Sequence, residues 1–172
     1  MKYTKEELDF FKKNGFKENY PYGMLFNLDV TVNGDHAYDC AGIYYGKNKS
    51  GAMLEYYSSL LDMIIDHMSY ADMTDNEVKK RKEDLLTDIQ IWIEKLNKAA
   101  GTSFKTTHID IPMSFFIGIE IKDVDFQSLC EKIRKFAVLM DKSLMAILEK
   151  VSETNSWDVR FSEAPIAEIN DD

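Results

Sequence analysis

Two aspartates in the first third of the chain could share a proton or hold a divalent cation. Asp29 lies in an alternating apolar and polar segment, and Asp39 lies beyond the Asn33-Gly34 turn signal. A three-residue turn over residues 33–35 would bring the two carboxylates opposite each other on the polar face of a hairpin. Like charges directly opposite each other destabilise a sheet, so this pairing would indicate a function. The alternative interpretation is two separate, solvated acids.

A second group of residues could perform acid–base or metal chemistry. His108 and Asp110 share one parity of an alternating segment, and a hairpin turning near residues 112–114 would bring Glu120 opposite Thr106. A histidine flanked by carboxylates can act as a general base or as a metal ligand. If both hairpins belonged to one sheet, these groups and the two aspartates would suit a small metal-dependent hydrolase. The alternative is a solvent-exposed histidine with a structural role.

No complete catalytic motif accompanies these residues. The three histidines are far apart in the sequence, and no metal-ligand pair, phosphate-binding loop or nucleophile elbow is present. Cys40 could be a nucleophile beside His36, but the predicted register places it on the apolar face, where cysteine behaves as a small hydrophobic residue. Cys130 is expected on the core side of a helix. The sequence therefore indicates no cofactor and no metal.

The distribution of charge is the other feature with a functional consequence. Thirty Asp and Glu residues outnumber 21 Lys and Arg, which gives a net charge of -9. Residues 1–50 and 101–150 are balanced, whereas residues 51–100 carry -4 and residues 151–172 carry -5. Acidic zones attract basic proteins and repel nucleic acid. The acids expected to form them are Glu55, Asp62, Asp66, Asp72, Asp75, Glu163, Glu168, Asp171 and Asp172.

Tyrosines are the second component of the expected interface. Tyr44 and Tyr45 belong to a group of six tyrosines that also includes Tyr20, Tyr22, Tyr56 and Tyr57. Tyrosine is enriched at interfaces because it combines apolar area with a polar tip. The alternative is that these rings border the core.

Together these features favour a non-enzymatic binding or inhibitor protein with an acidic surface. The expected partner is a basic protein, for example the nucleic-acid-binding surface of a nuclease, which the acids would occupy as a nucleic-acid mimic. Neither direct nucleic-acid binding nor membrane binding is expected. The alternatives are the hydrolase described above and a homo-oligomerising structural module. Two free thiols, no apolar run of about 20 residues and no apolar leader predict a cytoplasmic protein.

Helix signals are clear in four segments. Capping-box spacing predicts helices from Thr4 to Gly15 and from Thr74 to Gly101, and Asp125 is a predicted N-cap of a long helix that reaches Val151. Apolar residues at intervals of three and four predict another helix over residues 53–70.

Strand signals occur in pairs. Residues 24–32 and 36–45 form one predicted hairpin, with Leu28 opposite Cys40 and Val32 opposite His36. Residues 109–121 form the second, with Ile109 opposite Ile117, and residues 157–161 form a possible short strand. The prediction is one α+β domain over residues 1–172. It has an antiparallel sheet of two hairpins, three long amphipathic helices on one face, and an acidic tail from about residue 164.

Overall fold

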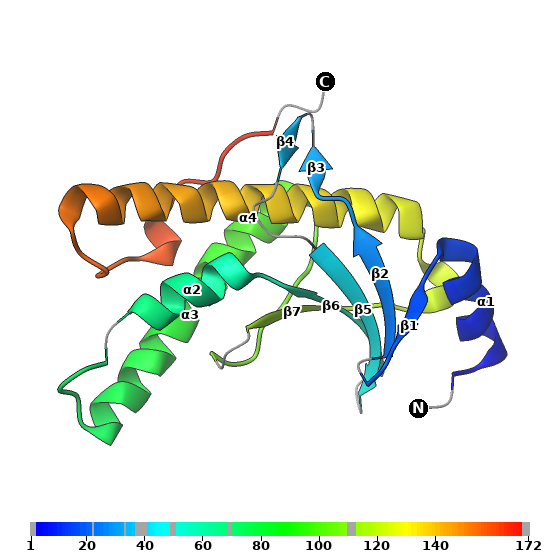
Figure 1. The fold of residues 1–172 in the computed structure, drawn as a ribbon, viewed down its shortest axis with the longest axis horizontal. Helices are drawn as coiled ribbons and strands as arrows, with labels where there is room; N and C mark the ends of the chain where they lie inside the picture. Colours follow the sequence, from blue (N-terminus) through cyan, green and yellow to red (C-terminus); the bar gives the residue numbers. More distant parts are fainter. Residues whose placement is uncertain are drawn as a thin grey trace.

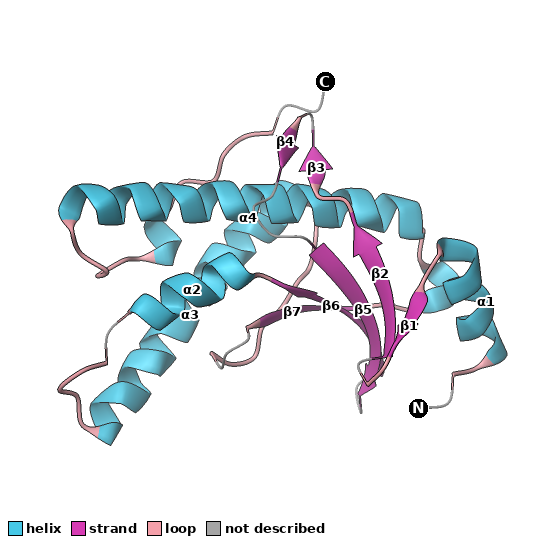
Figure 2. Cartoon of the chain, viewed as in Figure 1, coloured by secondary structure: helices cyan, strands magenta, loops and turns pink. Residues whose placement is uncertain are grey.

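The computed structural model describes residues 3–21, 23–32, 34–36, 41–48, 51–68, 70–109 and 113–169. These residues form a five-stranded antiparallel sheet, a separate two-stranded ribbon and four α-helices (Figures 1 and 2), which confirms the α+β class. The elements in chain order are α1 (Lys5–Asn14), β1 (Lys17–Asn19), β2 (Gly23–Leu28), β3 (Thr31–Val32), β4 (Asp35–His36), β5 (Ala41–Asn48), β6 (Gly51–Tyr57), α2 (Ser59–His67), α3 (Asp75–Ala100), β7 (Ser114–Gly118), the 3₁₀ helix η1 (Ile121–Asp123), α4 (Phe126–Thr154) and the 3₁₀ helix η2 (Phe161–Glu163).

The main sheet has one face buried against helices. Its strand order is β1-β2-β5-β6-β7, and every neighbouring pair is antiparallel. Figure 1 shows α4 running crosswise to β2 and β5. Phe136 of α4 packs against Phe115 of β7, with their ring centroids 5.8 Å apart. The buried side chains of the sheet are Leu28, Ile43, Tyr45, Leu54, Tyr56, Phe115 and Ile117.

The helix ends follow the local signals in the sequence. Thr4 and Thr74 each form a complete capping box with the glutamate three residues later. The side chain of Asp125 accepts a hydrogen bond from Ser128 N at 3.3 Å, as an N-cap does. Left-handed Gly15 and Gly101, with φ of 77° and 68°, end α1 and α3. These boundaries confirm the predicted helices.

The segment predicted as one helix over residues 53–70 is wrong in its first part. Residues up to Tyr57 form β6, and α2 begins at Ser59 after Ser58 accepts a hydrogen bond from Leu61 N at 3.2 Å. Leu54 and Tyr56 are both buried, which is the two-residue period of a strand. β6 is hydrogen-bonded on both sides, to β5 and β7, and this pairing outweighs the helical spacing. The described helices are therefore two long ones, of 26 and 29 residues, and two short ones, of 10 and 9.

The register predicted for the first hairpin is also wrong. Val32 pairs with Asp35 across a two-residue turn, and Leu28 pairs with Ala41 instead of Cys40. Asn-Gly favours the two-residue turn because its twist matches that of the strands. Two residues connect β2 to β3, and four connect β4 to β5. Because these connections differ in length, the register of the β3–β4 ribbon does not continue into the β2–β5 pair. Asp39 and Cys40 lie outside the described residues.

The second predicted hairpin is reduced to one strand and one bridge. Phe116 of β7 exchanges backbone hydrogen bonds of 2.7 and 2.8 Å with Lys105. A register with Ile109 opposite Ile117 does not allow Lys105 to lie opposite Phe116, so the predicted pairing is wrong. On its other edge, β7 pairs with β6, and Ile117 lies opposite Leu54. Ile109 and Ile117 are nevertheless both buried, which agrees with their place in the alternating apolar series of residues 109–121.

The C-terminal segment contains no strand among its described residues. Residues 156–160 have no ladder partner, and η2 follows. Val159 and Phe161 are buried, and Trp157 stacks on His67 with ring centroids 4.8 Å apart. Residues 164–169 differ from the expected acidic tail, because Ala164 is buried and the apolar residues after it pack against the core.

A buried hydrogen bond connects α1 to the sheet. Glu7, 8% exposed, accepts from Thr4 N at 2.7 Å through one carboxylate oxygen. Its other oxygen accepts from the hydroxyl of Tyr45 at 2.9 Å. Burial and this hydrogen bond raise the pKa of Tyr45 above the ordinary value for tyrosine.

Replacement of Tyr45 should therefore change the response of the protein to alkali. Because the folded-state pKa is raised, the contribution of Tyr45 is complete below the ordinary pKa of about 10 and is lost as the pH rises above it. Tyr45→Phe should lose about 1–2 kcal/mol at neutral pH and then show a smaller alkaline decrease than wild type. Urea unfolding over a pH series measures both effects. Tyr20→Phe, at a side chain 90% exposed, is the control. A variant with the full wild-type alkaline decrease would contradict this account.

Candidate functional site

The face of the sheet opposite the core carries a continuous row of side chains. Directly opposed residues of an antiparallel sheet lie on the same face, so the observed registers place one residue from each strand in line. The bridge to Phe116 extends the line by one residue beyond β7. We call this set the cross-strand row: Lys17, Leu25, Tyr44, Glu55, Phe116 and Lys105.

The cross-strand row is much more exposed than the opposite face of the same strands. Tyr44, Glu55 and Phe116 are half-buried. Their sequence neighbours Tyr45 and Phe115 point into the core and are fully buried. The helices therefore cover one face of the sheet and leave the face with the cross-strand row more open.

Glycines keep the backbone accessible on one side of the row. Gly46 and Gly118 lie two positions after Tyr44 and Phe116, which places them on the same face. A Cβ atom built at either glycine would meet no atom within 4 Å. Open space therefore borders the row at Gly46 and Gly118, on either side of Met53, which pairs with both.

A cavity of about 540 Å³ lies beside the row at the end of β2. Leu25, Asn27, Asp29, Gly42, Tyr44 and Tyr57 are among its lining residues. Asp29 is held in place there, because its carboxylate accepts from the Thr31 hydroxyl at 3.0 Å and its carbonyl accepts from Arg134 Nε at 2.7 Å. Two carboxylates, Asp29 and Glu55, therefore share this face with three aromatic rings. Carboxylates and aromatic faces both attract a lysine ammonium or an arginine guanidinium.

The residues predicted for acid–base or metal chemistry do not come together where the structure describes them. Glu120 forms an exposed ion pair with Lys122 at 3.5 Å. His108 is exposed, and its Nδ1 lies 2.8 Å from the Thr107 hydroxyl. Within the described ranges, no three His, Cys, Asp or Glu side chains are grouped as a metal site requires. Asp110, like Asp39, is outside those ranges.

The second predicted hairpin placed Thr106 opposite Glu120, and this pairing is wrong. Thr106 is buried, and the bridge at Lys105 sets a different register. Cys130 lies in the core, as predicted, and burial raises its pKa to about 11. Its thiol is therefore protonated and unreactive at neutral pH.

Two residues predicted to contact a partner are buried instead. Asp62, 4% exposed, accepts a hydrogen bond from Met113 N at 2.9 Å. Tyr45 is 0% exposed and bonded to Glu7. Both predictions are wrong, because the polar group of each residue is bonded inside the fold and cannot reach a partner.

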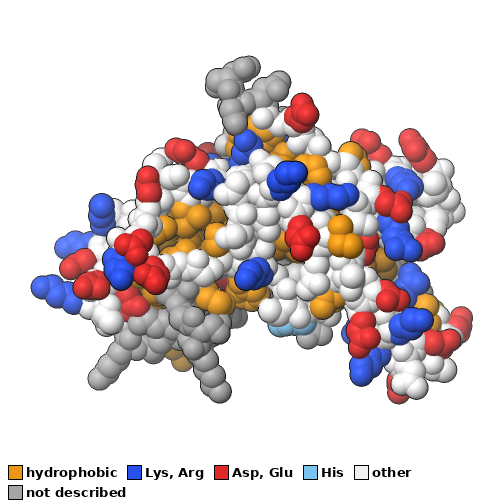
Figure 3. All heavy atoms as spheres, turned by 180° about the vertical axis from the view of Figure 1, so that it is seen from behind, with side chains coloured by type: hydrophobic (Ala, Val, Ile, Leu, Met, Phe, Trp, Pro, Cys, Tyr) orange, Lys and Arg blue, Asp and Glu red, His pale blue; other side chains and the backbone are white. Residues whose placement is uncertain are grey.

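Most of the remaining predicted acids are exposed. Figure 3 shows a face on which acidic and basic side chains are intermingled, with no separate zone of either sign. The acids in exposed positions are Asp66, Asp72, Asp75, Glu163 and Glu168, while Asp171 and Asp172 fall outside the described residues. Tyr44 and Glu55 are different, because the register makes them direct neighbours.

Sequence reasoning missed Phe116, the third member of the central group. The available signal is the adjacent pair Phe115-Phe116, because neighbouring residues of a strand face opposite sides. One of the two rings must therefore lie on the face away from the core.

Comparisons of this chain with family models, with curated proteins and with solved structures give no match. Across the described residues, no helix has both the length and the apolar character needed to cross a bilayer. A function must therefore be argued from the site itself.

Proposed function

We propose that this chain is a non-enzymatic binding protein that docks a basic protein partner on the open face of its sheet. The observation that carries the proposal is the position of Glu55, directly between Tyr44 and Phe116 in the cross-strand row. A lysine or arginine side chain of the partner would meet the carboxylate and be flanked by the two aromatic rings.

Charge supports this choice of partner at two scales. The net charge of -9 increases the rate of encounter with a basic protein, and the effect weakens with salt. At the site itself, Lys17 and Lys105 end the row and confine its anionic part to the centre. This arrangement favours one inserted cation instead of a broad basic surface.

The magnitudes are sufficient for a specific contact. A cation–π contact contributes about 0.5–2 kcal/mol, and a charge-assisted hydrogen bond about 1.5–3 kcal/mol. A partner surface that normally binds phosphates carries such cations, so occupation of that surface would inhibit a nucleic-acid enzyme. The inhibitor role predicted from the sequence remains part of this proposal.

The test uses the acetylated and amidated peptide Gly-Arg-Gly-Arg-Gly and its citrulline counterpart, which is neutral and nearly isosteric. Calorimetric titration should detect binding of the arginine peptide that the citrulline peptide lacks. Glu55→Gln should weaken that binding by about tenfold, because the lost interaction is worth roughly 1.4 kcal/mol.

Glu163→Gln is the matched control, since it removes the same charge at an exposed residue away from the row. It should change the affinity by less than about twofold. Equal weakening by both variants would reduce the effect to net charge and overturn the proposed site, as would equal binding of the two peptides.

A further inference from the structure

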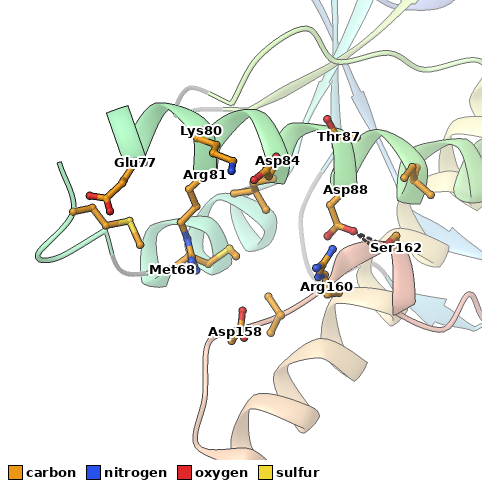
Figure 4. A pocket seen from close by; sticks show the side chains of 14 residues that line it. Met68, Glu77, Lys80, Arg81, Asp84, Thr87, Asp88, Asp158, Arg160 and Ser162 are labelled. Carbon is orange, nitrogen blue, oxygen red and sulfur yellow. Dashed lines mark hydrogen bonds between the residues drawn. The ribbon is translucent and has the colours of Figure 1, made fainter. Parts of the chain in front are cut away.

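A second cavity lies apart from the sheet, between α3 and the C-terminal segment. Its volume is about 720 Å³, within the range of small-molecule sites. Figure 4 shows Arg81 and Asp88 pointing from α3 toward the segment that carries Asp158 and Arg160. The end of α2 contributes Met68. The cavity therefore has walls from three parts of the chain.

One wall is held rigidly by hydrogen bonds. Asp88 is buried, and its carboxylate accepts from Phe161 N at 2.6 Å and from Ser162 N at 3.2 Å. The Ser162 hydroxyl donates to the same carboxylate. Asp88 is thus already engaged and is not available to a ligand. Glu77, another lining acid, is likewise used in the cap of α3.

The other charged groups of the lining are unpaired. Lys80, Arg81 and Arg160 supply positive charge, and Asp84 and Asp158 supply negative charge. None of these five side-chain charges has a hydrogen-bond or ion-pair partner among the described residues. The cavity therefore presents positive and negative side chains that are not paired with each other.

Arg81 has a specific unmet requirement. Its Nε atom is buried and has no hydrogen-bond partner. The hydroxyl of Tyr70 is also buried without a partner, and Arg81 is near enough to lower the pKa that burial raises. The buried Nε atom is closed to a ligand, so an oxyanion would bind Arg81 through the terminal nitrogens of its guanidinium, which make no hydrogen bond to the described residues.

Apolar side chains complete the lining. Met68, Met73, Leu85 and Val159 contribute to it, and Met68, Leu85 and Val159 are themselves buried. A ligand that fits this cavity needs a carboxylate, a cationic group and a compact apolar part.

We propose that this cavity binds a small zwitterion of the α-amino-acid class. Its carboxylate would meet Arg81, its ammonium would meet Asp158, and its apolar side chain would lie against Met68, which Figure 4 shows on the same side of the cavity. This site is separate from the cross-strand row and does not depend on the function proposed there.

The test uses L-leucine and two analogues that each lack one charge. These are 4-methylpentanoate, which has only the carboxylate, and 3-methylbutylamine, which has only the ammonium. Nitrogen–proton NMR of the arginine side chains should show a saturable shift of the Arg81 Nε–H resonance with L-leucine. Each analogue should bind at least about tenfold more weakly, because one charge-assisted contact is lost.

Three variants distinguish the site from a general charge effect. Arg81→Lys keeps the charge but lacks the forked donors of the guanidinium, and it should weaken leucine binding about tenfold. Asp158→Asn, at an exposed residue, should weaken binding of leucine but not of 4-methylpentanoate. Lys79→Gln, on α3 but outside the lining, should leave leucine binding unchanged. Circular dichroism checks that each variant is folded.

Two outcomes would overturn the inference. One is the absence of a saturable shift at Arg81 with L-leucine. The other is equal binding of 4-methylpentanoate and leucine, which would indicate a simple anion site. Glu55→Gln should not alter leucine binding, so failure of this inference and failure of the proposed function can be distinguished.

Discussion

Asp88→Ala should lower the free energy of unfolding by about 3–4 kcal/mol, a large part of the stability of a typical domain. The carboxylate is 8% exposed and accepts hydrogen bonds from two backbone N–H groups and one hydroxyl. Its removal leaves those donors without an acceptor at the point where η2 meets α3. Phe161, whose ring centroid lies 5.4 Å from that of Trp92, would lose its anchor.

Urea unfolding measures this loss, and the fluorescence of Trp92 in a Trp157→Phe background reports separation of the segment. Ser162→Ala removes only one of the three donors and should cost about 1 kcal/mol. Asp84→Ala, at an exposed aspartate one turn earlier on α3, should cost less than about 0.5 kcal/mol. If Asp88→Ala were no more destabilising than Asp84→Ala, the carboxylate would not hold the C-terminal segment.

Phe136→Ala should lower the free energy of unfolding by about 3–5 kcal/mol and the melting temperature by about 6–20 °C. Phe136 is 0% exposed, and its ring centroid lies 4.7 Å from that of Phe104 and 5.8 Å from that of Phe115. Truncation therefore removes buried apolar area and leaves a cavity where α4 meets the sheet.

Two further α4 variants show whether the effect comes from this position. Phe136→Leu should cost less, because much of the volume is kept. Met145→Ala changes an exposed side chain and should cost less than about 0.5 kcal/mol. A loss below about 1 kcal/mol for Phe136→Ala would be incompatible with α4 packing on the sheet at this point.

Part of the candidate site could be predicted from residue type alone. Tyr44 and Glu55 were expected at an interface because of their aromatic and acidic character. Asp62 and Tyr45 were expected there for the same reasons, yet the fold buries both. Residue type does not show whether such a side chain is exposed or buried, because the deciding partner is distant in the sequence. The backbone N–H of Met113 bonds to Asp62, and Glu7 bonds to Tyr45.

The sequence alone determined the ends of the long helices. Thr74 with Glu77 and the left-handed Gly101 act within a few residues of each other, so the capping of α3 needs no distant contact. The same holds for Asp125 at the start of α4. The α+β class also followed from the sequence, since strand signals occurred in pairs between helices.

Only the tertiary structure decided the strand registers and, with them, the cross-strand row. Residues 53–57 satisfy both a helical and a strand pattern, and pairing with β5 and β7 selects the strand. Phe116 joins Glu55 because one edge of β7 pairs with β6, while an isolated bridge links its other edge to Lys105. Backbone hydrogen bonds between strands join residues far apart in the chain, and a local pattern carries no information about which strand lies alongside.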